Sequence, residues 1–222
     1  GKHINWSLSA DNGDNLLSPG ENPEKNLVFL LVMAALLRGV DKYGFLLRLS
    51  TATASNDLRL GGHEAPPAII SVFLGDELTQ LLLCIADGEH WNTDKSNELM
   101  LGAKVLPLIP RDISDRNRTS PIAFTGGKFE FRMPGSSLSA GGPMTVINTI
   151  VADGLQYYAD QLESCSDIDA AVHKLLRSEI STHQNIIFNG DNYSESWRAQ
   201  ALSRGLGEYK TLPDVLPLIK SS

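Results

Sequence analysis

The chain has 222 residues, of which 42% are hydrophobic and 20% are charged, and its formal net charge at pH 7 is -7. This composition is typical of a folded, soluble protein, and the acidic balance argues against a nucleic-acid partner. The apolar run at residues 27–37 is too short to cross a bilayer, so we expect a buried helix there and no membrane association.

The cysteine content points to a reducing compartment. Cys84 and Cys165 lie far apart in the sequence, and their spacing matches neither a disulfide framework nor a metal-binding motif. The sequence also shows no signal peptide. We therefore expect a cytoplasmic protein.

Turn, cap and periodicity signals predict a single unit that mixes helices and strands. Alternating side chains over residues 1–9 indicate a strand. A helix is expected to begin at Asn22-Pro23-Glu24, because proline suits the first helical turn, and to end near Tyr43, before Gly44. The remaining predictions are strands at 45–53, 68–73 and 128–132, helices at 76–86, 144–162, 167–183 and 194–204, and a polar insertion at 89–98.

The predicted strand at 128–132 carries an unusual charge pattern. Alternate side chains of a strand share a face, so Lys128, Glu130 and Arg132 project together while two phenylalanines occupy the other side. The loop before this strand adds Arg116 and Arg118. Such a cluster suits a metal-bound phosphate next to a substrate that carries carboxylates.

Four segments carry a pattern that can be compared with known families: GKHINWS at 1–7, NDLRLGGHEAPP at 56–67, DRNRTS at 115–120 and KFEFR at 128–132. Together they resemble the catalytic region of glutamine synthetase, most closely the long-subunit type III class, and they occur in the family's order. Residues 188–190 and 194–197 resemble the type III C-terminal region.

The resemblance implies an α+β fold in which a curved antiparallel sheet lines the active site and helices pack outside it. Residues 1–222 would be the C-terminal part of the catalytic domain with a type III helical extension. The N-terminal part would then be absent from this chain. Members of the family form large rings, so a homo-oligomer of stacked hexamers is expected.

The resemblance assigns His3 and Glu130 to one Mg²⁺ or Mn²⁺ ion, with the ligands of a second ion upstream of this chain. These residue types suit the chemistry, since imidazole and carboxylate are good ligands for divalent cations. Asn5, Ser7 and Lys128 are assigned to ATP. Two alternatives stay open: His3 could be a surface histidine on an edge strand, and Glu130 could form a salt bridge with a neighbouring cation.

The arginines are assigned by partner. Arg59 and Arg132 match the positions that bind the glutamate carboxylates, and Arg118 matches the residue that neutralises the transferred phosphoryl group. A guanidinium can bind carboxylate and phosphate through two parallel hydrogen bonds, which suits both roles. For Arg116 we expect a structural ion pair instead.

Glu64 lies in the glycine- and proline-rich segment 61–67. Glycines allow movement and the paired prolines stiffen the exit, so we predict a lid that carries the Glu64 carboxylate into the site on closure. In the family this glutamate shields the intermediate and takes a proton from bound ammonium.

The implied activity is ATP-dependent ligation of ammonium to L-glutamate, giving L-glutamine through γ-glutamyl phosphate. Phosphoryl chemistry of this kind depends on positioning and charge neutralisation, which accounts for the metal ligands and the arginines. One alternative is a γ-glutamyl ligase that uses another amine, and a second is a non-catalytic relative. Because part of the site lies upstream, we expect the 222 residues alone to be inactive.

Overall fold

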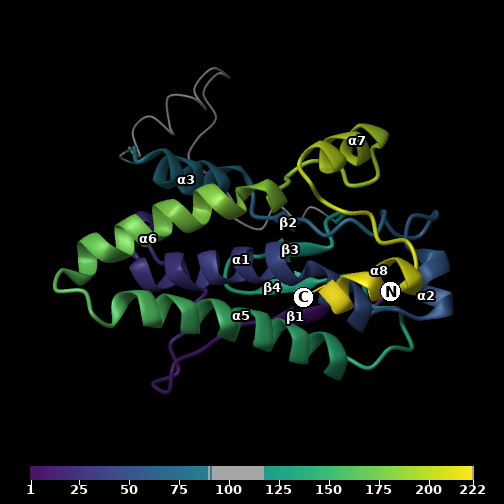
Figure 1. Cartoon of the computed structure of the whole chain (residues 1–222), viewed down its shortest axis with the longest axis horizontal. Coiled ribbons are helices and arrows are strands. Elements are labelled where there is room, and N and C mark those ends of the chain that lie inside the picture. Colours follow the sequence, from purple (N-terminus) through teal and green to yellow (C-terminus); the bar gives the residue numbers. More distant parts are fainter. Residues whose placement is uncertain (90, 92–117, 222) are drawn as a thin grey trace, which may run out of the picture.

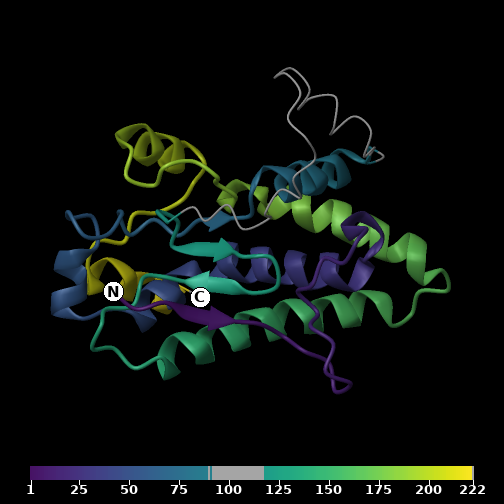
Figure 2. The same cartoon turned by 180° about the vertical axis from the view of Figure 1, so that it is seen from behind.

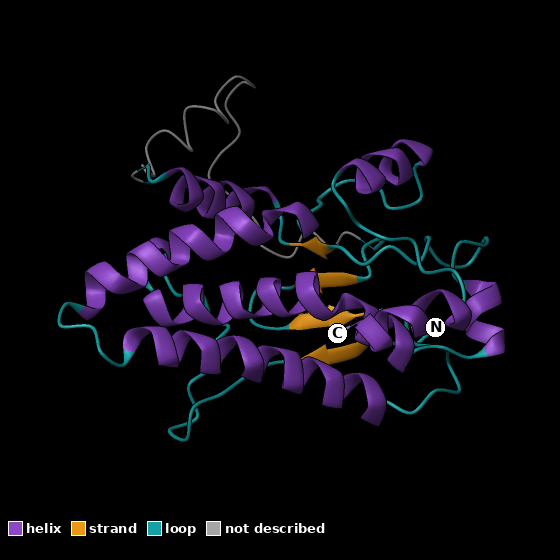
Figure 3. Ribbon diagram, viewed as in Figure 1, coloured by secondary structure: helices purple, strands orange, loops and turns teal. Residues whose placement is uncertain are grey.

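The computed structural model describes residues 1–89, 91 and 118–221, and it combines helices with one small sheet (Figures 1 and 3). The mixed helix and strand class expected from the sequence is confirmed. In chain order the elements are β1 (Ile4–Trp6), η1 (Pro23–Lys25), α1 (Leu27–Ser50), α2 (Ala54–Arg59), β2 (Val72–Phe73), α3 (Asp76–Asp87), β3 (Ile122–Phe124), β4 (Phe129–Phe131), α5 (Gly141–Leu162), α6 (Ile168–His183), η2 (Gln184–Ile186), α7 (Glu195–Ser203) and α8 (Leu212–Ser221).

The sheet has the strand order β1-β4-β3-β2. Strand β4 is antiparallel to both β1 and β3, whereas β2 runs parallel to β3. The expectation of a wholly antiparallel sheet was therefore wrong for β2. A parallel neighbour requires a long connection, and here α3 and the segment after it lie between the two strands.

Helices α1 and α5 cover one face of the sheet, and in the view from behind the strands lie in front of these helices (Figures 1 and 2). The alternation in β1 places Ile4 and Trp6 in the core and leaves the residue between them exposed. The two helices approach closely at glycines. A Cβ on Gly39 would lie 2.8 Å from the Ile150 carbonyl oxygen, so this crossing requires the absence of a side chain.

Residues 45–50 are the last six residues of α1, so the strand expected at 45–53 was wrong. Tyr43 has non-helical angles (φ -125°, ψ 18°), so the helix is kinked before Gly44 but does not end there. The continuation buries Leu47 and Arg48 completely. Thr53 then caps α2 by accepting a hydrogen bond from the Asn56 amide, in a helix that the sequence patterns did not reveal.

Other boundaries moved by a few residues. The proline at position 23 begins a single 3₁₀ turn, and α1 starts after Asn26, whose side chain accepts from the Phe29 amide. The helices predicted at 76–86, 144–162, 167–183 and 194–204 are confirmed as α3, α5, α6 and α7. Strand β3 and helix α8 were not predicted. Most of the insertion expected at 89–98 falls outside the described residues.

The C-terminal segment docks on the rest of the chain through a small apolar cluster around Ile69, Trp197 and Ala201. The Phe188 and Trp197 rings are stacked, with centroids 3.7 Å apart. Trp197 is only 1% exposed, so α7 is anchored even though most of its surface faces away from the main core. No helix within the described ranges is long and apolar enough to cross a membrane.

Candidate functional site

The site forms at one edge of the sheet because of the strand directions. Ile4 of β1 and Ile122 of β3 both pair with Phe131 of β4. Since β4 is antiparallel to both neighbours, the beginning of β1, the beginning of β3 and the end of β4 meet at this edge. The residues just outside these strand ends, which include His3 and Arg132, are therefore brought together.

A cleft of about 250 Å³ opens at this edge, and we call it the arginine cleft. Five residues assigned from the sequence line it: His3, Arg59, Glu64, Arg118 and Arg132. The rest of its lining consists of Gly1, Leu60, Ala65, Pro66, Pro67, Thr119, Ser120, Pro121, Met133 and Tyr193.

His3 and Glu130 lie close together, as the metal assignment requires. The His3 Nδ1 atom is 3.8 Å from the Glu130 Oε2 atom, although the His3 side chain is 61% exposed. The same Glu130 oxygen lies 3.0 Å from Nη2 of Arg132. The salt-bridge alternative for Glu130 therefore has a structural basis too. Among the described residues no group of three or more histidine, cysteine, aspartate or glutamate side chains is arranged to hold a metal.

The three residues assigned to ATP do not line the arginine cleft. Asn5 pairs with Glu130 across the two strands, so both side chains lie on the sheet face away from α1 and α5. Ser7 and Lys128 are also exposed on this side of the sheet. The Ser7 hydroxyl contacts the Asn15 side chain at 2.9 Å and the Gly127 carbonyl at 3.2 Å, next to the turn between β3 and β4.

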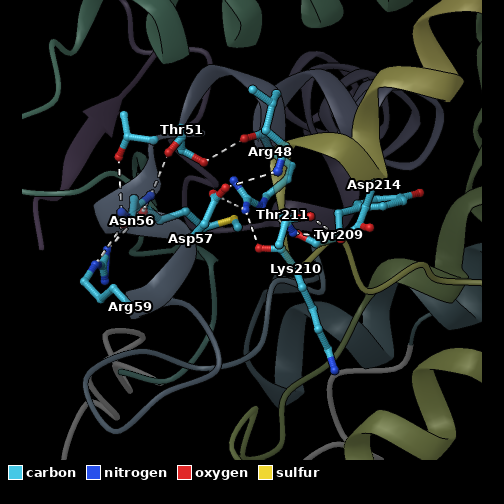
Figure 4. A network of polar contacts seen from close by, with 12 residues as sticks. Arg48, Thr51, Asn56, Asp57, Arg59, Tyr209, Lys210, Thr211 and Asp214 are labelled. Carbon is cyan, nitrogen blue, oxygen red and sulfur yellow. Dashed lines mark hydrogen bonds and ion pairs between the residues drawn. The ribbon is translucent and has the colours of Figure 1, made fainter.

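Arg59 is held in place by hydrogen bonds at the end of α2 (Figure 4). Its Nε donates to Asn56 Oδ1 at 3.0 Å, and its Nη2 donates to the Met133 and Pro134 carbonyls at 2.9 and 3.1 Å. The buried Asn56 amide also donates to the carbonyls of Thr51 and Met133. Asn56 lies in a segment that carried the resemblance, but its orienting role was missed.

Arg118 is exposed in the turn that precedes β3. Within the part of the chain that the structure describes, no hydrogen bond or ion pair is made by its guanidinium group. The neighbouring Asp115 and Arg116, including the ion pair expected for Arg116, lie outside the described residues. Arg118 is thus a cation at the cleft whose charge these residues do not neutralise.

The loop that carries Glu64 is closed by its own backbone. The Gly61 amide donates to the Ala65 carbonyl at 3.1 Å and to the Pro66 carbonyl at 3.0 Å. Gly61 has φ +80°, a conformation that favours glycine. The Glu64 side chain is 64% exposed and belongs to the lining of the cleft. The carboxylate therefore sits at the rim of the arginine cleft.

Tyr193 is a lining residue that sequence reasoning missed, because no motif or periodicity marked it. It comes from the loop before α7, and its hydroxyl donates to the Glu64 carbonyl at 3.2 Å. Burial raises the pKa of this tyrosine, which outweighs the opposing effect of the nearby Arg59. The hydroxyl is therefore protonated, and able to donate, at neutral pH.

Known proteins with similar sequences indicate the family to which this chain belongs. The family model of the glutamine synthetase C-terminal domain matches residues 171–222. A type-3 glutamine synthetase of Dictyostelium discoideum is 44% identical over 100% of this chain. Glutamine synthetases of Butyrivibrio fibrisolvens and Bacteroides fragilis are 41% and 40% identical over 98% and 97% of it.

The chain spans only 30% of the length of the Dictyostelium relative and 31% of each bacterial one. This coverage agrees with the expectation that it is part of a longer polypeptide. The matched relatives cover the β1 and β4 segments, the Glu64 loop and the C-terminal helices alike, so the resemblance read from the sequence is confirmed. The chain belongs to the glutamine synthetase family.

Proposed function

We propose that the protein containing this chain joins ammonia to L-glutamate at the expense of ATP and gives L-glutamine. The observation that carries the proposal is the arginine cleft, where three guanidinium groups from separate segments line one opening together with Glu64. Guanidinium groups in this number suit a ligand that bears carboxylate and phosphoryl groups. The names of the three relatives, all glutamine synthetases, support the same activity.

In the first step a side-chain carboxylate oxygen of glutamate attacks the γ-phosphorus of ATP, and ADP leaves with the bridging oxygen. Arg59 and Arg132 bind the glutamate carboxylates, and Arg118 neutralises the charge on the phosphoryl group during transfer. The lack of a described partner for Arg118 is consistent with this role, because a group already neutralised by the protein would gain less from the ligand.

In the second step the nitrogen of ammonia attacks the acyl carbon of γ-glutamyl phosphate, and inorganic phosphate leaves. Ammonium must lose a proton before its nitrogen can attack, and Glu64 accepts that proton. Its exposed position on a glycine-containing loop suits a carboxylate that enters the cleft when substrates are bound. Closure of the same loop keeps water away from the acyl phosphate.

The His3 and Glu130 pair fits two ligands of one Mg²⁺ or Mn²⁺ ion. An imidazole nitrogen and a carboxylate oxygen 3.8 Å apart need only a small movement to contact one cation, and both atom types suit it. A divalent ion held there supplies positive charge for the ATP phosphates. Arg132 keeps the Glu130 carboxylate oriented toward the cleft edge.

Asn5, Ser7 and Lys128 are proposed to contact ATP from the exposed face of the sheet, beyond Glu130. Their position outside the arginine cleft is compatible with this role, because the γ-phosphate is the only part of ATP that must reach Arg118. Lys128 supplies a flexible ammonium group that can approach the phosphates.

We further propose that residues 1–222 form the C-terminal part of the catalytic domain and its helical extension. In the whole protein the sheet would continue as the curved sheet that lines the active site. A homo-oligomer of stacked hexameric rings and a cytoplasmic location stay predictions drawn from the family resemblance. Size-exclusion chromatography with light scattering of the full-length protein tests the assembly.

The test of the proposed function is Glu64→Ala in the full-length protein. The parent should release one phosphate for each glutamine, whereas the variant should release phosphate in excess, because water competes better for the acyl phosphate. Glu163→Ala removes an exposed glutamate at the end of α5, outside the cleft lining, and serves as the matched control.

The parental ratio and rate in Glu64→Ala would contradict the role of this loop. Replacing ammonium with larger amines in the same assay tests the amine. Faster turnover with a larger amine than with ammonium would overturn the assignment to glutamine synthesis.

A further inference from the structure

Two residues before α7, Asn192 and Tyr193, contact the two loops that carry Glu64 and Arg118. The Asn192 amide N–H donates to the Thr119 Oγ1 atom at 3.0 Å, and the Tyr193 hydroxyl donates to the Glu64 carbonyl at 3.2 Å. The two loops are far apart in the sequence. The Asn192-Tyr193 pair is therefore a shared support for both.

The Asn192 side of this support is buried. Asn192 is 2% exposed, and its Oδ1 accepts from the Ser71 hydroxyl at 2.9 Å, just before β2. This hydrogen bond connects Asn192 to the residue just before β2. Thr119 directly follows Arg118, so a hydrogen bond to its hydroxyl restricts the turn from which the Arg118 side chain projects.

The Tyr193 side reaches the arginine cleft itself. The ring contributes to the lining, while the hydroxyl bonds to the backbone of Glu64 and leaves the carboxylate available. A bond to the backbone carbonyl can set the position of the loop without competing for the group that accepts a proton. Tyrosine suits this role because its rigid side chain has few rotatable bonds.

The segment that carries both residues is itself well anchored. Asp191 Oδ1 accepts from the Tyr193 amide at 2.9 Å, and the Asp191 carbonyl accepts from the Ser194 amide at 3.2 Å. Ser194 caps α7 through the Trp197 amide. Trp197 is buried and stacked on Phe188. The packing of the C-terminal segment therefore helps to hold Asn192 and Tyr193 in position at the cleft.

We propose that Tyr193 and Asn192 are positioning residues through which the C-terminal segment sets the Glu64 loop and the Arg118 turn. The inference rests on the proposed function, because it concerns how the same two groups are held for the reaction. Both residues lie in the segment that matches the C-terminal domain model. The inference gives this segment a direct part in coupling ATP cleavage to amide formation.

The first arm of the test is Tyr193→Phe in the full-length protein, which removes one hydroxyl and keeps the ring. The share of phosphate released without glutamine should rise about fivefold, the effect expected from loss of one hydrogen bond worth about 1 kcal/mol. The KM for ATP should change little. Tyr157→Phe removes a hydroxyl from α5, which contributes nothing to the cleft lining, and is the matched control.

The second arm compares Thr119→Val with Thr119→Ser. Valine keeps the shape of threonine but cannot accept from the Asn192 amide, whereas serine keeps the acceptor. Thr119→Val should therefore lower phosphate release and glutamine formation together, as expected for a displaced Arg118, by about fivefold. Thr119→Ser should restore most of both rates.

The outcomes separate the two proposals. If the parent protein makes no glutamine, the proposed function fails. If the parent is active but Tyr193→Phe keeps the parental ratio of phosphate to glutamine, the positioning role is overturned. It is equally overturned if Tyr193→Phe melts at a lower temperature and loses both steps in proportion, or if Thr119→Val and Thr119→Ser behave alike.

Discussion

Arg48 and Arg118 are the same residue type in opposite surroundings. Arg48 is 0% exposed, and its guanidinium bonds to Asp57 Oδ1 at 2.5 Å and to the carbonyls of Tyr209 and Lys210, both at 2.7 Å (Figure 4). Arg118 is exposed at the cleft and makes no such bond within the described residues. The Nε and Nη2 atoms of Arg48 are bonded by the fold, whereas among the described residues its Nη1 has no hydrogen-bond partner and Arg118 makes no bond.

The difference shows how to separate a structural arginine from a binding one. A buried guanidinium needs a counter-charge and several acceptors, because removing it from water without them is costly. Arg48 thereby links α1, α2 and the segment just before α8. In the proposed function Arg118 is a partly solvated cation, and its interaction energy is available for the phosphoryl group during transfer.

Arg48→Met should give the largest change and should affect stability. Removal of one member of a buried ion pair leaves Asp57 without its cation and should lower the free energy of unfolding by about 3 to 5 kcal/mol. Thermal unfolding of the full-length protein measures the effect, with Arg118→Met as the matched control. Equal melting temperatures for the two variants would show that Arg48 contributes no more to stability than the exposed Arg118.

Arg118→Ala should leave the melting temperature within the range of an ordinary surface substitution and act on catalysis. Loss of a cation that stabilises transition-state charge should lower kcat by about 10² to 10³. Steady-state kinetics of the full-length variant, with phosphate and glutamine both followed, should show the two products falling in proportion. A change in their ratio would place Arg118 in the second step instead.

Two buried carboxylates, Glu130 and Glu179, also differ in their surroundings. Glu130 and Glu179 are both 6% exposed. Glu179 lies among Arg38, Tyr158 and His183 between helices, whereas Glu130 lies between Arg132 and the exposed His3. The first set is enclosed between helices, whereas the second includes His3, whose side chain is 61% exposed.

Glu130→Gln should raise the concentration of Mg²⁺ or Mn²⁺ needed for half-maximal activity by about 10- to 100-fold, because one charged oxygen ligand is lost. A metal titration of the full-length enzyme at fixed ATP measures this. Should the titration of the variant overlay that of the parent, Glu130 is a salt-bridge partner of Arg132 and the metal assignment is wrong.

Tyr158→Phe should have the smallest effect, about 1 kcal/mol at neutral pH, from loss of the hydroxyl that donates to Glu179 at 3.1 Å. Burial and the Glu179 charge raise the pKa of Tyr158 well above its usual value of about 10. The stability that depends on its proton is therefore complete below about pH 10 and is lost as the pH rises further.

Melting temperatures between pH 7 and pH 11 test this dependence. The parent should lose more stability than Tyr158→Phe over the alkaline part of the range, so the gap between them should narrow. Tyr193 and Tyr209, whose pKa values burial also raises, should leave some alkaline decline in the variant. A constant gap across the range would argue against a buried, neutral Tyr158.

The sequence by itself determined the features that depend on near neighbours. The two-residue period predicted a strand within residues 1–9, and β1 lies there with Ile4 and Trp6 in the core and the residue between them exposed. Helix periodicity and caps located α3, α5, α6 and α7 to within a few residues. The order of the four family segments predicted which cations and carboxylates meet at the arginine cleft, and five of them do.

Only the tertiary structure decided the features that depend on distant partners. Residues 45–50 contain an apolar run that fits a strand or a helix. In the helix that they form, Arg48 is buried. Its hydrogen-bond acceptors lie at residues 57, 209 and 210, far along the chain in two of the three cases. Tyr193 likewise enters the cleft through the docking of α7 about 130 residues after Glu64. Local patterns encode contacts within a few positions, whereas burial and charge pairing are settled when the whole chain packs.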